Sequence, residues 1–390
     1  MIYKQAFKFL FALLIAVMLC ACPQEGEDEE ALFKLGDSKV AAYISTWSTW
    51  NADLIKGEYL SDLIISFALI SKSNGYSLYI PELSGRFSHL WDEVSALKEK
   101  YPHLNVTLSV GGANESGFSP MAENSAKRAG FITDVCDWLE KNNLDGVDVD
   151  WEYPVRPLTG GGPFPQDREN YIILLQELRD ALDALGEKTG KRYSLSTAVP
   201  ANSRFTTDVD AKKASEIVDS FKLMSYDYYG SWSSTTGHNA KLYRNPRDPN
   251  NWSTDHAVAN FLNAGVLPEK IMLGVAFYGR IWGGVSQGAY SATPGLFQSY
   301  QNIPFGGSLS WTNLKQSYLT SDSGYTRYWD DNAKAPFLYN GNRWITYTDE
   351  EQIAAVGAYA KEKNLGGVFT WEYANDMSGE LIKALAESAK

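Results

Sequence analysis

Residues 144–154 read Leu-Asp-Gly-Val-Asp-Val-Asp-Trp-Glu-Tyr-Pro and combine a strand pattern with a high density of acids. Side chains alternate between the two faces of a β-strand, so Asp148, Asp150 and Glu152 should share one face. The opposite face then carries Val147, Val149 and Trp151. We expect the acidic face to point into a barrel and the apolar face to pack against helices. The alternative is an amphipathic strand whose acidic face is exposed to water.

Seven further short runs of β-type residues occur along the chain, beginning near residues 39, 63, 105, 193, 221, 271 and 366. Amphipathic helical segments separate several of them, and one such segment places Leu90, Val94 and Leu97 on a single face. Thr348 and Glu351 form a capping-box pattern ahead of the last strand. Strands that alternate with helices indicate a parallel sheet, and eight such units predict an α/β fold, the (β/α)8 or TIM barrel. The active site of such a barrel lies at the C-terminal ends of its strands.

The last two strand runs start near residues 271 and 366, a gap about twice as long as the others. Residues 281–346 are therefore the candidate for an insertion, and they are rich in Trp and Tyr among Gly, Ser and Asn. We expect a small α+β subdomain between strand 7 and strand 8, on the catalytic face. The barrel itself should comprise residues 38–280 and 347–390.

The N-terminus has the pattern of an export signal. Lys4 and Lys8 precede an apolar run over residues 9–19, which is too short to span a bilayer and is typical of a signal peptide. The following Leu-Cys-Ala-Cys, ending at Cys22, resembles the cleavage box of bacterial lipoproteins. We expect a signal peptide over residues 1–21, lipidation of Cys22 and an acidic tether over residues 22–37. The protein would then be an exported lipoprotein held at a membrane, facing the cell surface or the periplasm. Ordinary signal cleavage is the alternative.

Composition excludes several classes of function. The chain has 390 residues and a net charge of −12, so a nucleic-acid partner is not expected. Three Cys residues rule out a disulfide scaffold, and the helical spacing of Cys136 predicts a core position. The four His residues lack metal-type spacing. We therefore expect no metal and no cofactor, and a membrane contact only through the lipid anchor.

The crowding of acids on one strand suggests general acid catalysis. Neighbouring carboxyl groups share protons, so at least one of Asp148, Asp150 and Glu152 should stay protonated near neutral pH. Glu152 lies closest to the C-terminal end of the strand and hence nearest to a substrate.

This strand and other strand ends together resemble a known enzyme family. Asp145-x-x-Asp148-x-Asp150-x-Glu152 resembles the signature of glycoside hydrolase family 18, the chitinases. Matching segments elsewhere are Ser109-x-Gly111-Gly112, Met224-x-Tyr226-Asp227, Phe277-Tyr278-Gly279-Arg280 and Gly366-Gly367-Val368-x-x-Trp371-Glu372. The resemblance covers residues 38–390, and the insertion resembles that of the deep-groove chitinases. Strand 1, with Tyr43 to Trp47, follows the family pattern only loosely.

The resemblance implies a reaction in which the acetamido oxygen of the substrate is the nucleophile. Glu152 would protonate the glycosidic oxygen, and Asp150 would orient the acetamido group. Asp148 would control the protonation of Asp150. Tyr226 would donate a hydrogen bond to the acetamido oxygen.

The resemblance also implies a set of substrate-binding residues. Asp227 and Arg280 would bind sugars around the cleavage point, and Trp371 would form the floor under the distorted ring. Further contacts are assigned to Tyr153, Tyr278, Phe67 and Tyr43.

The implied function is that of a retaining chitinase, which hydrolyses β-1,4 bonds between N-acetylglucosamine units of chitin or chitooligosaccharides. The protein is expected to be a monomer. One alternative is an endo-β-N-acetylglucosaminidase acting on N-glycans. Another is a non-catalytic chitin-binding lectin, against which the presence of Glu152 argues.

Overall fold

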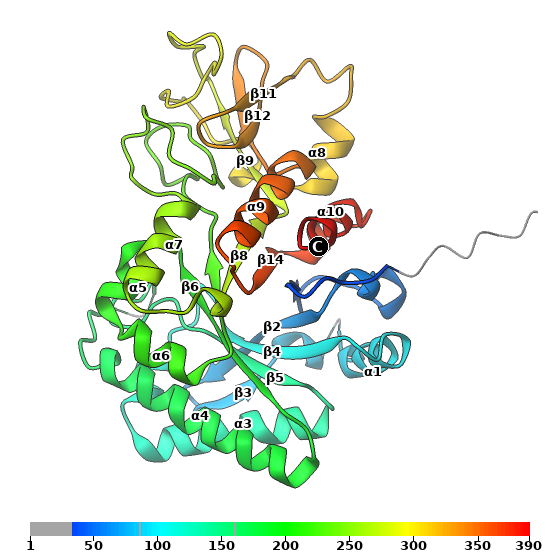
Figure 1. The fold of residues 1–390 in the computed structure, drawn as a ribbon, viewed down its shortest axis with the longest axis vertical. Coiled ribbons are helices and arrows are strands. Elements are labelled where there is room, and N and C mark those ends of the chain that lie inside the picture. Colours follow the sequence, from blue (N-terminus) through cyan, green and yellow to red (C-terminus); the bar gives the residue numbers. More distant parts are fainter. Residues whose placement is uncertain (1–32, 86, 160) are drawn as a thin grey trace, which may run out of the picture. The chain divides into compact units, whose positions relative to one another are not determined.

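Eight parallel strands close into a barrel at the centre of residues 34–390 in the computed structural model (Figure 1). Their order is β1-β14-β8-β7-β6-β5-β4-β2, and β1 pairs with β2 to close the ring. The strands are β1 Lys39–Ser45, β2 Asp62–Ser71, β4 Asn105–Gly111, β5 Gly146–Asp150, β6 Ser194–Pro200, β7 Ser220–Met224, β8 Ile271–Ala276 and β14 Gly367–Trp371. The predicted (β/α)8 fold is confirmed, with all eight strands near their expected positions.

The structure describes residues 33–85, 87–159 and 161–390. The predicted signal peptide, Cys22 and most of the tether lie outside the described residues. In the part that is described, no helix is long and apolar enough to cross a membrane.

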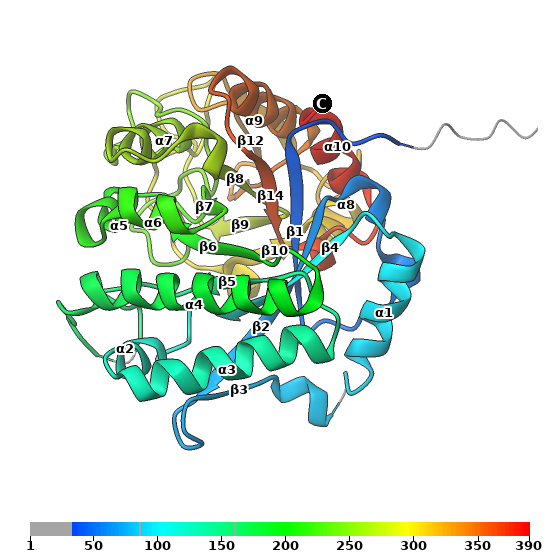
Figure 2. The same cartoon turned by 60° about the horizontal axis from the view of Figure 1, so that its bottom comes forward.

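Helices cover the outside of the barrel, as Figure 2 shows for α1, α3 and α4. The longer ones are α1 Leu90–Lys100, α3 Ser125–Lys141, α4 Asp167–Thr189, α7 Thr254–Asn263, α9 Glu350–Glu362 and α10 Glu380–Ser388. Shorter ones are α2 Phe118–Ala122, α5 Ser203–Asp208, α6 Ala211–Ile217 and α8 Trp311–Ser317. The predicted apolar face of α1 is confirmed, since Leu90, Val94 and Leu97 are all fully buried.

Two local predictions are wrong. The N-cap of α9 is Asp349, whose carboxylate accepts the amide of Gln352, and not Thr348, whose side chain is buried. Cys136 is half-buried and not a core residue. The buried face of α3 follows Phe131, Val135 and Leu139 at four-residue spacing. Cys136, which follows Val135, is therefore turned toward the edge of that face.

A second sheet of five antiparallel strands is formed by the segment between β8 and α9. Its order is β10-β9-β13-β12-β11, with β9 Tyr278–Gly283, β10 Ser308–Ser310, β11 Thr326–Asp330, β12 Ala335–Tyr339 and β13 Arg343–Thr346. Only Phe277 separates the end of β8 from the start of β9. The second sheet therefore begins at Tyr278, ahead of the predicted boundary at residue 281. Figure 1 shows β9, β11 and β12 with α8 at one end of the picture.

The aromatic side chains of this second sheet form largely its own core. Trp282 and Trp344 are fully buried with ring centroids 5.6 Å apart, and Phe337 stacks on Trp344 at 5.2 Å. Other aromatic residues of the segment lie at its surface, since Tyr290 is exposed and Tyr328 and Trp329 are partly exposed.

Strand β5 has the two faces that its sequence predicted. Val147 and Val149 are fully buried, and Trp151 stacks on Phe118 of α2 with centroids 5.1 Å apart. Asp148 and Asp150 are buried on the other face. The acidic face is therefore enclosed by the barrel and not exposed to water.

Candidate active site

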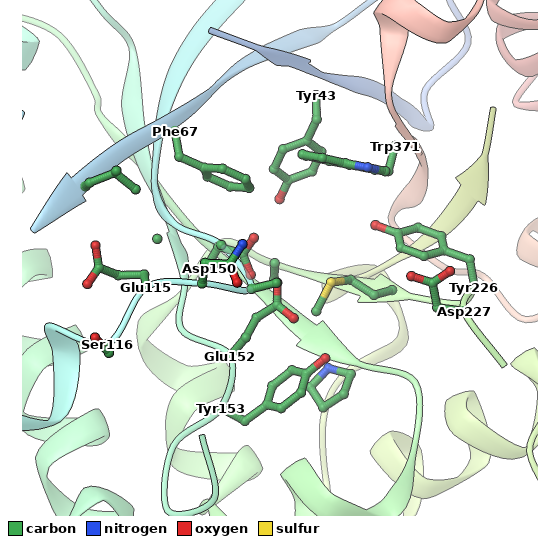
Figure 3. A pocket seen from close by; sticks show the side chains of 18 of the residues that line it. Tyr43, Phe67, Glu115, Ser116, Asp150, Glu152, Tyr153, Tyr226, Asp227 and Trp371 are labelled. Carbon is green, nitrogen blue, oxygen red and sulfur yellow. The ribbon is translucent and has the colours of Figure 1, made fainter. Parts of the chain in front are cut away.

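A cavity of about 700 Å³ opens at the C-terminal ends of the barrel strands. Its lining includes ten side chains that bear on the chemistry: Tyr43, Trp47, Phe67, Asp150, Glu152, Tyr153, Tyr226, Asp227, Trp252 and Trp371. Figure 3 shows Asp150 and Glu152 in its middle, with Tyr226 and Asp227 to one side and Glu115 to the other.

Asp148 lies deepest among the three acids and does not line the cavity. Its carboxylate accepts hydrogen bonds from the hydroxyls of Tyr43 at 2.8 Å, Ser109 at 2.8 Å and Ser196 at 2.6 Å. The ammonium of Lys222 lies 3.7 Å from its Oδ1. Donors and a positive charge thus surround this fully buried carboxylate.

Asp150 has the opposite environment. Its Oδ1 is buried and has no hydrogen-bond partner among the described residues. Burial raises the pKa of Asp150 well above its usual value, and the charges of Glu152 and Asp148 raise it further. Gly111 lets β4 approach this residue, because a Cβ there would lie 2.1 Å from the carbonyl oxygen of Asp150. The result is a carboxyl group that favours its protonated form and keeps a free acceptor.

Glu152 follows the end of β5 and reaches the cavity. Burial raises its pKa from 4.5 to about 7, and the charge of Asp227 adds to the rise. A hydrogen bond with Tyr153 acts in the opposite direction. A carboxylic acid with a pKa near neutrality can donate a proton to a substrate and take one back from water.

Aromatic rings form an apolar floor beside the acids. Trp371 stacks on Phe67 with ring centroids 5.6 Å apart and planes inclined by 17°. Tyr43 and Trp47 lie 5.7 Å and 6.2 Å from Trp371. The predicted floor residue thus lies within a cluster of four rings.

Asp227 joins the barrel to the second sheet. It accepts hydrogen bonds from the hydroxyl of Tyr278 at 2.9 Å and from Arg280 at 2.5 Å, both on β9. The guanidinium of Arg280 also lies 5.0 Å from the ring of Trp232, which is largely exposed. Neither Tyr278 nor Arg280 lines the cavity itself, so within it they act through Asp227.

Tyr226 lies in the cavity wall, with its ring 6.2 Å from Tyr278 and 6.3 Å from Phe369. Burial raises the pKa of its hydroxyl well above the usual value, and the charges of neighbouring acids add to this. The group therefore stays a hydrogen-bond donor at neutral pH.

The sequence analysis missed several residues of the site. Trp252 lines the cavity with 45% of its surface exposed, and it also borders a side pocket of about 220 Å³. Its position before the N-cap Ser253, in a loop rich in Asn, was the available signal. Glu115 also lines the cavity, but its carboxylate is used by the amides of Ile70 and Gly117.

The described part of the chain contains no group of three or more His, Cys, Asp or Glu residues arranged to hold a metal ion. Asp148 is paired with three hydroxyls and Lys222 instead.

Comparisons with known proteins agree with this geometry. The sequence model of a family described as glycosyl hydrolases family 18 matches residues 39–376. Chitinase A1 of Niallia circulans is 38% identical over 308 residues, which are 75% of this chain and 44% of that protein. Chitinase 1 of Aphanocladium album is 30% identical over 95% of this chain and 89% of its own length. The chain spans between 40% and 59% of the length of several other curated relatives.

Solved structures give the same result. A family 18 N-acetylglucosaminidase from Paenibacillus barengoltzii superposes with a TM-score of 0.81 at 33% identity, over 90% of this chain and 99% of that one. Chitinase ChiA74 from Bacillus thuringiensis has a TM-score of 0.83 at 29% identity, over 90% of this chain and 70% of its own. The barrel, the acids of β5 and the family match together show that the chain belongs to glycosyl hydrolases family 18.

Proposed function

We propose that the protein is a chitinase that hydrolyses β-1,4 linkages between N-acetylglucosamine units of chitin or chitooligosaccharides. The observation that carries this proposal is the arrangement of Asp150 and Glu152 in the cavity, with a pKa of about 7 for Glu152. The curated relatives named as chitinases support the substrate class.

The cavity residues favour a nucleophile supplied by the substrate. A retaining glycosidase with two carboxylates needs a second free carboxylate across the sugar from the acid. Among the described lining residues, Glu115 is held by two amides and Asp227 by Tyr278 and Arg280. Asp150 lies deeper than Glu152 on the same face of β5. The acetamido oxygen of the bound sugar can attack the anomeric carbon instead, with the advantage of an intramolecular reaction.

Each residue then has a defined part in the reaction. Glu152 protonates the leaving glycosidic oxygen as the acetamido oxygen forms its bond to the anomeric carbon. The buried Oδ1 of Asp150 accepts the acetamido N–H, and the Tyr226 hydroxyl donates to the acetamido oxygen. Glu152 then removes a proton from a water molecule that opens the cyclic intermediate from the opposite face. The product keeps the β-configuration, because the anomeric carbon is inverted twice.

The test is to incubate the protein with chitin hexamer, measure the products by mass spectrometry and measure their anomeric form by NMR. Fresh products of two to four units in the β-form are expected. The absence of products from any chitin oligomer, or α-anomers, would contradict the proposal.

A second candidate is exo-acting release of single N-acetylglucosamine units. The Paenibacillus barengoltzii structure, which the chain covers almost completely, is described as an N-acetylglucosaminidase. Accumulation of monomer from the first minutes of hexamer hydrolysis would favour this candidate. An N-glycoprotein incubated in parallel tests the endo-β-N-acetylglucosaminidase alternative, and binding without products would indicate a lectin.

We also propose that residues 1–21 direct export and that Cys22 carries a lipid anchor, on the sequence pattern alone. The acidic stretch over residues 22–37 would then hold a monomeric enzyme away from the membrane. Cys22→Ala should move the protein from the membrane fraction to the soluble fraction. An unlipidated wild-type protein that is soluble from the start would refute this.

A further inference from the structure

A lysine is buried in the barrel beneath the acids. Lys222 lies on β7 between Phe221 and Leu223, and its side chain points into the barrel with 6% of its surface exposed. Its Nζ lies 3.7 Å from Oδ1 of Asp148, which is fully buried. A buried ammonium is costly unless a negative charge faces it.

Four other charged groups face Lys222 from the strands around it. They lie below the cavity, toward the N-terminal ends of the strands, a region that we call the barrel floor. Asp148 belongs to β5, Asp62 to β2 and Lys39 to β1, and Asp219 precedes β7. Lys39 lies 3.9 Å from Asp62, and Asp219 forms an ion pair with Arg192. Asp62 and Asp219 thus each have another cation nearby. The negative charge for Lys222 is therefore that of Asp148.

The surroundings of Asp148 favour its ionised form. Three hydroxyls donate hydrogen bonds to its two oxygens, and Lys222 faces one of them. Protonation would oblige one of these hydroxyls to turn and accept, and it would leave the buried ammonium without its negative partner. Asp150, whose Oδ1 lacks a partner among the described residues, meets no such cost when it is protonated.

We infer that Lys222 is a positioning residue for the proton of the acid array. Its ammonium keeps the negative charge on Asp148, so that the shared proton stays on the Asp150–Glu152 side of the array, next to the substrate. This inference rests on the proposed function only for its kinetic consequence, because the placement of the proton can also be observed directly.

The first test compares the pH dependence of kcat/KM for the wild type and Lys222→Met. Loss of a positive charge within about 4–6 Å moves carboxyl titrations up by about 1–3 pH units. The midpoint of the acidic limb of the kcat/KM profile should therefore move up by at least about one pH unit. At a pH below this midpoint, kcat/KM should fall about tenfold. Lys39→Met, a change at the same barrel floor of a lysine that faces Asp62, is the matched control and should leave the limb in place.

A double-mutant cycle separates this effect from packing. In an Asp148→Asn background, Lys222→Met should shift the acidic limb by much less, because the negative charge on Asp148 that Lys222 stabilises is already absent. An unchanged acidic limb together with a lowered Tm would overturn the inference, since Lys222 would then only fill the barrel. Lys222→Gln is the second variant if the methionine protein does not fold.

A second readout does not depend on activity. The ¹³C-carboxyl signals of Asp150 and Glu152 should titrate at higher pH in Lys222→Met than in the wild type. If the protein cleaves no chitin oligomer but the signals shift, the proposed function fails while the inference stands. If the protein is active and the signals do not shift, the inference fails alone.

Discussion

Replacing Glu152 by glutamine should remove activity and at the same time stabilise the fold at alkaline pH. Glu152 is a nearly buried acid whose pKa rises from 4.5 to about 7, mainly through burial. Such an acid keeps its proton in the folded protein after the unfolded chain has lost it. Once both states are ionised, the folded state carries the cost of a desolvated charge that glutamine does not have.

The size of the effect follows from this pKa. Below about pH 4.5 the acid is neutral in both states, so the substitution should change stability little. Between about pH 4.5 and 7 the ionised unfolded state is increasingly favoured, and stability falls as the pH rises. Above about pH 7 the full difference is present, and the rise in pKa corresponds to about 3 kcal/mol. The charge of Glu152 also acts on Asp150, so its removal relieves a second buried acid.

The assay is the free energy of unfolding in urea at about pH 4 and about pH 8, for the wild type and Glu152→Gln. We expect equal stabilities at the lower pH and a gain approaching 3 kcal/mol at the higher pH, with kcat lowered by about 10²–10⁴-fold. Glu99→Gln, the same chemical change on the exposed face of α1, is the control and should change neither. A stability difference that is independent of pH, or a loss at the higher pH, would refute the reasoning.

Three further outcomes are expected. The value of kcat/KM should fall as the pH rises through about 7, because Glu152 must be protonated to donate; a pH–rate profile that is flat to about pH 9 would contradict this. Asp150→Asn should lose at least about 10² in kcat, with little change in oligomer affinity by calorimetry, because in the proposed mechanism its unpartnered oxygen accepts only the N–H of the reacting acetamido group. Trp252→Ala should raise KM for a hexamer several-fold and leave KM for a disaccharide reporter unchanged, since Trp252 lines the outer cavity and the adjoining side pocket.

The parts of the fold that depend on local periodicity could be predicted from the sequence. The two-residue alternation of β5 placed Asp148 and Asp150 opposite Val147 and Val149, and the structure has this arrangement. Barrel strands are short and regular, so each start could be found from the apolar run and its flanking turn. The active-site face followed from the fold, because parallel strands all end at the same side of a barrel.

The missed features depend on contacts between distant segments. A tryptophan in an insertion serves equally well as a core residue or a sugar platform, and the packing of Trp282 against Trp344 decides the matter only in three dimensions. Lys222 was part of a predicted strand, but a single lysine in a strand gives no sign that its partner is 74 positions earlier, at Asp148. Tyr278 marks the start of the second sheet through its pairing with Ser310, a contact across the insertion.

The three acids Asp148, Asp150 and Glu152 differ in their depth in the barrel and therefore in their surroundings. At the floor, three hydroxyls and Lys222 surround Asp148, and these favour a negative charge. One step higher, Asp150 is buried without a partner for Oδ1 among the described residues, and at the rim Glu152 meets the cavity. A proton in this array is therefore favoured on Asp150 or Glu152 rather than on Asp148, because three hydroxyls and the Lys222 ammonium stabilise the negative charge of Asp148. A change at the floor should consequently alter the acid at the rim without touching the sugar.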